Sequence, residues 1–212
     1  MNAILGIFTA LFSVVNPLGA VPLFLSLTEQ HSDNLRKKEA FKACVYFALI
    51  LITFLMLGTY ILSFFGITID SMRIAGGLII VRSGYNLMGG TYKKGRAINK
   101  EMEAEAIEKE DISFSPLAMP MLAGPGSISL LISMSTQSTN YATYFHILIA
   151  ILMLGIVTYF IFLFSPKLFN LLGRSGISAL SRIMGFIVIT IGIQFIVSGT
   201  TNIISDLLKL NV

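Results

Sequence analysis

The sequence predicts an all-α membrane protein whose six transmembrane helices form two inverted three-helix repeats, with the first and fourth helices broken near the midplane. The first observation is compositional. Of the 212 residues, 55% are hydrophobic and 12% are charged, whereas about 25% are charged in a typical soluble domain. Mean hydropathy is +0.81. Six long apolar stretches and a weak internal repeat are the other observations. Together they exclude a soluble enzyme, a nucleic-acid-binding protein and a disordered chain.

Six stretches are long enough to cross a bilayer, which takes about 20 mostly apolar residues. They are residues 3–27, 40–65, 72–89, 114–135, 144–164 and 183–204. We expect the first to remain as a helix, because it has no basic n-region and Asn16-Pro17 follows where a signal peptide would have its cleavage site. The single cysteine, Cys44, excludes a disulfide framework and a cysteine metal site.

The basic residues predict the orientation of the helices. Twelve of the 15 Lys and Arg residues lie around the connections that follow the first, third and fifth stretches: Arg36, Lys37, Lys38, Lys42, Lys93, Lys94, Arg96, Lys100, Lys109, Lys167, Arg174 and Arg182. Arg73 and Lys209 lie on the other side. By the positive-inside rule, both termini of this inner-membrane protein are expected on the non-cytoplasmic side of the membrane.

The long hydrophilic stretch in the middle of the chain divides it into residues 1–90, 91–112 and 113–212. Its Lys and Glu residues are spaced for ion pairs on a short exposed helix. We interpret residues 91–112 as a solvated cytoplasmic linker rather than a docking site for a partner.

The two halves of the chain match when one is shifted by 109 positions, which places Arg73 on Arg182 and Gly76 on Gly185. Small residues recur every seven positions in both halves: Gly76, Ser83 and Gly90, then Gly185, Gly192 and Gly199. This spacing predicts two helix backbones in close contact. Because each half has three helices, the second half must insert upside down, and inverted repeats are typical of transporters. The alternative is coincidence between apolar helices of similar composition.

Proline and glycine interrupt the first and fourth helices. Pro17 and Pro125 lack the amide hydrogen that a helix needs. Broken backbone at membrane depth is tolerated where it is buried or lines a cavity. Two half-helix N-termini would suit a carboxylate, and unwound carbonyls with nearby polar side chains would suit an ammonium group or a cation. The predicted substrate-binding residues are Asn16, Pro17, Gly19, Gly124, Pro125, Gly126, Ser127 and Ser129. The alternative is a pair of structural kinks.

Other polar residues are possible accessory residues. Arg82 lies deep in the third stretch with Asn86 on the same face, and none of the six stretches contains Asp or Glu. Two interpretations of Arg82 stay open: an intramembrane functional charge, or a side chain that snorkels to the cytoplasmic headgroups. Thr190 and Gln194 either face the cavity or bond between helices.

The sequence predicts neither catalysis nor a metal site. His31 and His146 have no partner at metal-ligand spacing, and no Ser-His-Asp set, phosphate loop or carboxylate pair occurs. We therefore expect no enzyme activity, metal or cofactor. A coupling ion, H⁺ or Na⁺, stays open, and Asp70 or the substrate itself is a possible proton carrier.

With these motifs the chain resembles the MarC/SnatA family of bacterial and archaeal inner-membrane proteins. The motifs are Asn16-Pro17-Leu18-Gly19 with Pro22, Pro116-Leu117-Ala118-Met119-Pro120, Ala123-Gly124-Pro125-Gly126-Ser127-Ile128, Arg73-Ile74-Ala75-Gly76-Gly77 and Arg182-Ile183-Met184-Gly185. The resemblance implies six helices in two inverted triplets. It also implies transport of small neutral amino acids, such as glycine or alanine, in at least some members.

The resulting hypothesis is a secondary transporter of small neutral amino acids that works by alternating access, with Pro17 and Pro125 holding the breaks open. Its partners would be the substrate and the lipid bilayer, with no nucleic acid, and a homo-oligomer is possible. The alternatives are an exporter of hydrophobic drugs or other small metabolites, and a scaffold that transports nothing.

Overall fold

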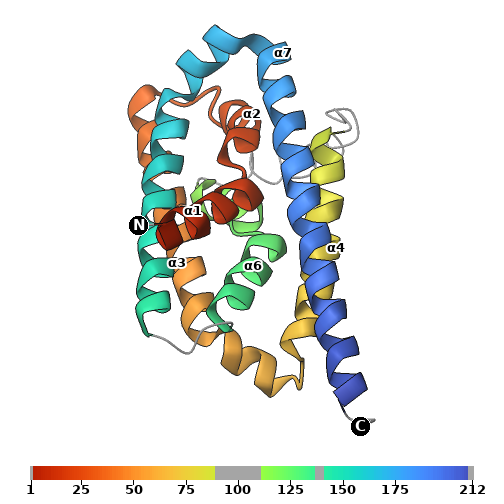
Figure 1. Cartoon of the computed structure of the whole chain (residues 1–212). Helices are drawn as coiled ribbons and strands as arrows, with labels where there is room; N and C mark the ends of the chain where they lie inside the picture. The colour runs from red at the N-terminus through yellow and green to blue at the C-terminus, as the bar shows by residue number, and fades with distance from the viewer. Residues whose placement is uncertain (1, 89–110, 137–140, 210–212) are drawn as a thin grey trace.

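The computed structural model describes residues 2–88, 111–136 and 141–209 and is helical throughout its regular structure, which confirms the all-α fold class (Figure 1). In chain order the elements are α1 (Asn2–Val15), α2 (Pro17–Leu27), α3 (Asp33–Phe64), α4 (Ile69–Met88), η1 (Ser113–Leu122), α6 (Pro125–Thr136) and α7 (Tyr141–Lys209). The predicted linker lies almost wholly outside the described residues.

Among the described residues, three helices are long and apolar enough to span a membrane: α3, and the two arms of α7 at Tyr141–Gly173 and Ser175–Leu208. The pairs α1 with α2 and η1 with α6 are bent by 42° and 60°, and the number rises to five if each pair is one span. The predicted breaks in the first and fourth helices are therefore confirmed. The predicted third helix forms as α4, but Arg73 and Arg82 lower its hydropathy, and it is not among these candidates.

The connection that the sequence predicts as a loop between the fifth and sixth helices is helical. Lys167 and Arg182 belong to α7, which is interrupted at Gly173 with φ 65° and ψ 179°. That backbone conformation is accessible essentially to glycine alone, so the reversal of direction is concentrated at this residue. Figure 1 shows α7 rising beside α3, bending, and returning beside α4.

Helix α3 begins seven residues before the predicted stretch at residue 40. The Ser32 side chain accepts a hydrogen bond from Leu35 N at 3.3 Å, which caps the helix at Asp33. The capped start adds a charged first part to α3, including Glu39. Glu39 lies one residue before the predicted apolar stretch, which itself contains no Asp or Glu, and its side chain is buried.

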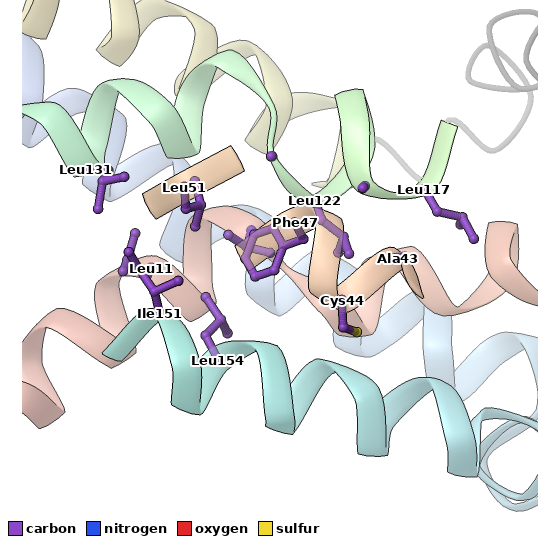
Figure 2. Packing of buried hydrophobic residues seen from close by; sticks show 14 of the residues in the cluster. Leu11, Ala43, Cys44, Phe47, Leu51, Leu117, Leu122, Leu131, Ile151 and Leu154 are labelled. Atoms are coloured by element: carbon purple, nitrogen blue, oxygen red, sulfur yellow. The ribbon is translucent and has the colours of Figure 1, made fainter. Parts of the chain in front are cut away.

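The described core packs both bent pairs against α3 and the first arm of α7. Leu11 of α1, Leu51 of α3, Leu131 of α6 and Ile151 of α7 are completely buried and point toward one another (Figure 2). Large apolar side chains such as Phe64 on the outer faces are exposed instead. Contiguous exposed apolar surface is typical of contact with lipid or another apolar partner.

Helix α4 and the second arm of α7 are antiparallel and in backbone contact. A Cβ atom on Gly77 would lie 2.7 Å from the Gly192 carbonyl oxygen, and one on Gly84 would lie 2.7 Å from that of Gly185. The predicted close contact at Gly185, Gly192 and Gly199 is therefore confirmed, since a Cβ atom on Gly199 would likewise lie 2.8 Å from the Asp70 carbonyl oxygen.

The other side of this contact was predicted one residue out of register. Gly77 and Gly84, not Gly76 and Ser83, face the glycines of α7. Gly76 instead lies against Ser129 of α6, Ser83 is exposed, and Gly90 lies outside the described residues. The physical reason is rotational. A seven-residue repeat defines a stripe along a helix, but the neighbouring helices determine which stripe meets which partner.

An ion pair ties the start of η1 to α3. Lys42 Nζ donates to Asp111 Oδ2 at 2.6 Å, and Asp111 Oδ1 accepts from Ser113 N at 2.9 Å. The hydrogen bond from Lys42 lowers the pKa of Asp111 to about 2.

This pKa shift predicts the pH range in which the Asp111 pair stabilises the fold. The folded pKa is depressed, so the contribution is fully present above the ordinary value of about 4 and is lost as the pH falls through about 2. Both side chains are partly exposed, so the effect is small. We expect Asp111→Asn to lower Tm slightly at neutral pH and not at about pH 2. Thermal unfolding in detergent at both pH values checks this, and an equal shift at both would contradict it.

Candidate functional site

A cavity of about 620 Å³ lies between the two bent helix pairs, α4 and the second arm of α7. The two pairs contribute their breaks, α4 contributes its second half, and α7 contributes the region just after its bend. The polar side chains that line the cavity are Asn16, Arg82, Ser83, Asn86, Ser127, Ser178 and Ser181.

The first break is centred on Asn16, which has a left-handed backbone with φ 48° and ψ 62°. Its amide donates to Phe12 O at 2.8 Å and ends α1, while its side-chain Oδ1 accepts from Gly19 N at 3.2 Å and caps α2. Asparagine is one of the few non-glycine residues that adopt this conformation readily. Pro17 then occupies the first position of α2, where a missing amide hydrogen costs nothing.

The second break follows η1, whose backbone is non-helical at Ser115 and Met119, each directly before a proline. The Ala123 amide still donates to Ala118 O at 2.8 Å, but the chain then leaves the helix, and α6 begins at Pro125. The Ser127 hydroxyl donates to Gly124 O at 2.9 Å and also contacts Leu122 O at 3.2 Å. Ser127 thereby joins the two sides of the break.

Both breaks present the N-terminus of a helix to the cavity. Figure 1 shows α2 leading from the middle of the molecule toward the bend of α7, and α6 leading away from it. The first amides of a helix have no acceptor within it, which applies to those of Gly126 and Ser127 in α6. Each helix N-terminus also carries a partial positive charge. The arrangement favours a negatively charged group between α2 and α6.

The charged part of the cavity lining is positive, as are the helix N-termini. Of the described residues that line it, Arg82 alone carries a charge, and no ion pair of Arg82 occurs within the described part of the chain. Its side chain is exposed. Within the same described residues no three His, Cys, Asp or Glu side chains gather as metal ligands. The chemistry offered is therefore that of hydroxyl and amide groups, which donate and accept hydrogen bonds, and of one cation.

The structure brings most of the predicted site residues to this cavity: Asn16, Gly19, Gly124, Pro125, Gly126, Ser127, Arg82 and Asn86. Pro17, Ser129, Thr190 and Gln194 are not in its lining. Ser129 Oγ turns away and donates to Met72 O at 3.2 Å. Thr190 is exposed and donates to Phe186 O in its own helix, and Gln194 donates to Ser198.

Three polar residues of the cavity lining were not predicted as site residues from the sequence. Ser83 lies between the predicted Arg82 and the contact glycine Gly84, while Ser178 and Ser181 lie just after the bend of α7. The latter two fall in the segment that the sequence predicts as a loop. Their three-residue spacing on one helix face is a signal, but it has meaning only once that segment is known to be helical.

Comparison with known proteins gives consistent matches over nearly the whole chain. Residues 1–204 match the MarC family integral membrane protein. A UPF0056 membrane protein of Methanocaldococcus jannaschii is 38% identical over 91% of this chain and 93% of its own length. The UPF0056 membrane protein YhcE of Escherichia coli is 37% identical over 95% of this chain and 94% of its own. YvbG of Bacillus subtilis, another UPF0056 membrane protein, is 34% identical over 92% and 93%. No solved structure matches.

Proposed function

The chain belongs to the MarC family of integral membrane proteins, and from this premise we propose that it is a secondary transporter of small neutral amino acids, such as glycine or alanine. In this proposal the solute crosses the inner membrane by alternating access around the cavity. The observation that carries the proposal is the convergence of two helix N-termini and Arg82 on one cavity.

The proposed topology has six crossings in two inverted triplets. The bent pairs α1 with α2 and η1 with α6 are the first and fourth crossings, and α4 is the third. The antiparallel contact of α4 with the second arm of α7 supports an inverted relation, since these are the last helices of each half. The distribution of basic residues supports termini on the non-cytoplasmic side.

The proposed substrate pose follows from the charges. The carboxylate lies between the first amides of α6 and the Arg82 guanidinium, where positive ends and donors meet. The ammonium group takes the remaining acceptors at the breaks, such as unwound carbonyls. Gly19 and Gly126 line the cavity without side chains, which suits a small substrate because it can then approach the backbone closely.

Two other functions compete with this proposal. An exporter of hydrophobic drugs needs an apolar cavity without fixed charge. Most residues that line this cavity are apolar, but Arg82 and six uncharged polar side chains also line it and favour a polar solute. A scaffold that transports nothing needs no cavity at the breaks. The scaffold has no observation in its favour beyond the exposed apolar surface that any membrane protein has.

Uptake of labelled glycine and alanine into proteoliposomes tests the proposal. We expect saturable uptake by the wild type and its loss in Asn16→Gly and Gly19→Ala. Glycine keeps the left-handed backbone of residue 16 without its side chain, so Asn16→Gly tests the side chain rather than the bend. A Cβ atom on Gly19 would overlap the Asn16 side-chain amide.

The matched control is Gly6→Ala in α1, where an added Cβ meets no atom within 4 Å. It should transport like the wild type. If the wild type moves neither amino acid while a known transporter does so in parallel, the substrate prediction is wrong, and the exporter and scaffold functions become the leading candidates.

A further inference from the structure

Glu39 is a buried carboxyl group that takes no part in the cavity described above. Its side chain lies in the early turns of α3, and the residue is 2% exposed. Glu39 Oε2 lies 2.7 Å from His31 Nδ1, while Oε1 is buried and has no hydrogen-bond partner among the described residues. An ionised carboxylate with an unsatisfied oxygen is costly to bury. A bound proton removes that charge, so Glu39 is suited to take up and release one.

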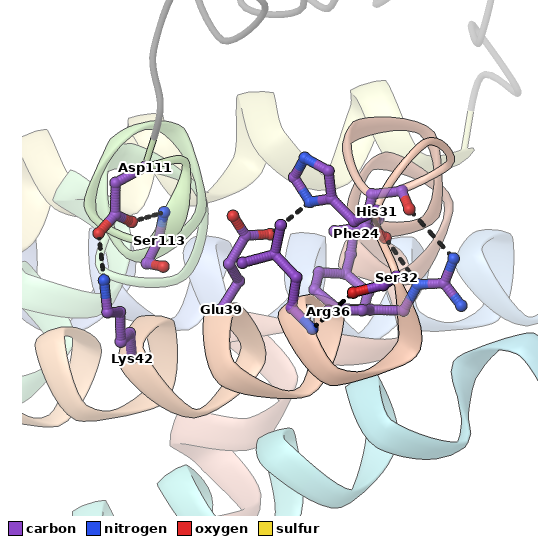
Figure 3. A network of polar contacts seen from close by, with 10 residues as sticks. Phe24, His31, Ser32, Arg36, Glu39, Lys42, Asp111 and Ser113 are labelled. Atoms are coloured by element: carbon purple, nitrogen blue, oxygen red, sulfur yellow. Dashed lines mark hydrogen bonds and ion pairs between the residues drawn. The ribbon is translucent and has the colours of Figure 1, made fainter.

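The cations near Glu39 are engaged elsewhere. Lys42 donates to Asp111 at 2.6 Å, and Arg36 donates to Thr28 O at 3.0 Å and pairs with Asp33 at 3.3 Å. Figure 3 shows Glu39 between the His31 ring and the Lys42–Asp111 pair. Within the described residues, His31 is thus the one side chain that lies within hydrogen-bond distance of the Glu39 carboxyl group. Its side chain is 26% exposed, which gives the pair a connection to solvent.

The position of Glu39 links both broken helices. His31 belongs to the connection after α2, and its amide donates to Thr28 O at 3.1 Å at the end of that helix. On the next turn of α3, Lys42 holds Asp111, two residues before η1 begins. A change of charge at Glu39 therefore acts where the ends of both bent pairs are tied to α3.

We propose that Glu39, with His31, is the proton-binding site that couples substrate movement to a proton gradient. The inference rests on the proposed transporter function and adds its driving ion. In each cycle the Glu39 carboxylate takes up one H⁺ when the bent pairs open toward the non-cytoplasmic side and becomes a neutral carboxylic acid. It returns to the carboxylate when the proton leaves by way of His31 on the cytoplasmic side, where the neighbouring basic residues place this end of α3. Neighbouring Asp111, with a pKa of about 2, stays ionised at physiological pH and does not supply this step.

Two assays on Glu39→Gln in proteoliposomes test the proposal. Counterflow of labelled against unlabelled glycine needs no net proton movement, whereas accumulation against a pH gradient does. With the membrane potential clamped at zero and one proton per glycine, a gradient of one pH unit sustains about tenfold accumulation. We expect Glu39→Gln to retain counterflow and to lose this accumulation. The matched control is Glu29→Gln, an exposed carboxylate in the preceding connection, which should behave as the wild type.

Each other outcome has a definite meaning. Accumulation by Glu39→Gln at the wild-type level overturns the inference and leaves the transporter function standing, as does accumulation driven by sodium alone. If Glu39→Gln does not fold, entrapped pyranine decides the matter in the wild type by recording proton flux. Proton flux that accompanies glycine uptake, with a pH profile that shifts in His31→Gln relative to the wild type, supports the Glu39–His31 proton site. Proton flux whose pH profile is the same in His31→Gln and the wild type overturns this site. A wild type that moves no amino acid in either assay overturns the proposed function and this inference with it.

Discussion

Replacing Gly84 by alanine will push α4 away from the second arm of α7 and lower the stability of the protein. The added Cβ would lie 2.7 Å from the Gly185 carbonyl oxygen and 2.8 Å from the Ile189 amide nitrogen. Both are backbone atoms, so no side-chain rotation relieves the contact. Overpacking of this kind typically costs about 1–3 kcal/mol. Thermal unfolding in detergent is the measurement, with a clear fall in Tm expected.

The matched control is Gly155→Ala in the first arm of α7. There the added Cβ meets its nearest atoms at 3.9 Å, which is ordinary contact. Because alanine favours a helix over glycine by about 1 kcal/mol, this variant should keep or raise Tm. Equal Tm values for the two variants would mean that α4 and α7 are not held together by their backbones.

The second large effect is expected at the cavity. Arg82→Gln should raise the KM for glycine roughly 10- to 100-fold, because hydrogen bonds to charged groups contribute about 1.5–3 kcal/mol and about 1.4 kcal/mol is a factor of ten. Arg82→Lys keeps the charge without the guanidinium fork, and its KM should lie between the two. Initial rates of uptake against glycine concentration measure all three.

A double-mutant cycle assigns the effect of Arg82 to the substrate carboxylate. Glycinamide, which lacks that carboxylate, should compete poorly for the wild type, and Arg82→Gln should lose most of this discrimination. If Arg82 only reaches toward the headgroups, the KM and the discrimination will both stay at wild-type values. The experiment thus decides between the two interpretations that the sequence leaves open for this residue.

The breaks of the first and fourth helices could be predicted from the sequence because their cause is local. A proline lacks its amide hydrogen wherever it lies in a fold, and Pro17 and Pro125 each begin a new helix. Family membership was predicted from motifs around the same prolines and glycines, and the matches confirm it. Gly185 and Gly192 were expected at a close helix contact and lie in one.

The burial of Glu39 could not be predicted in this way. The residue follows a run of charged side chains, and sequence alone places it in a solvated connection before the second helix. Its burial depends on the Ser32 cap that starts α3 early and on the loops that bring His31 and Asp111 beside it. Each of these is a contact made by a separate segment, and no spacing within the chain encodes it.

Hydropathy and proline chemistry act over a few residues, so the sequence by itself determined that this chain is an all-α membrane protein with two broken helices and a glycine-lined contact. The tertiary structure decided which stripe of α4 meets α7, and that Asn16, Arg82 and Ser127 share a cavity with Ser178. Those features depend on the rotation of each helix about its axis and on the bend at Gly173. Rotation and bend are set by packing between residues distant in the chain, where a shift of one residue turns a helix by about 100°.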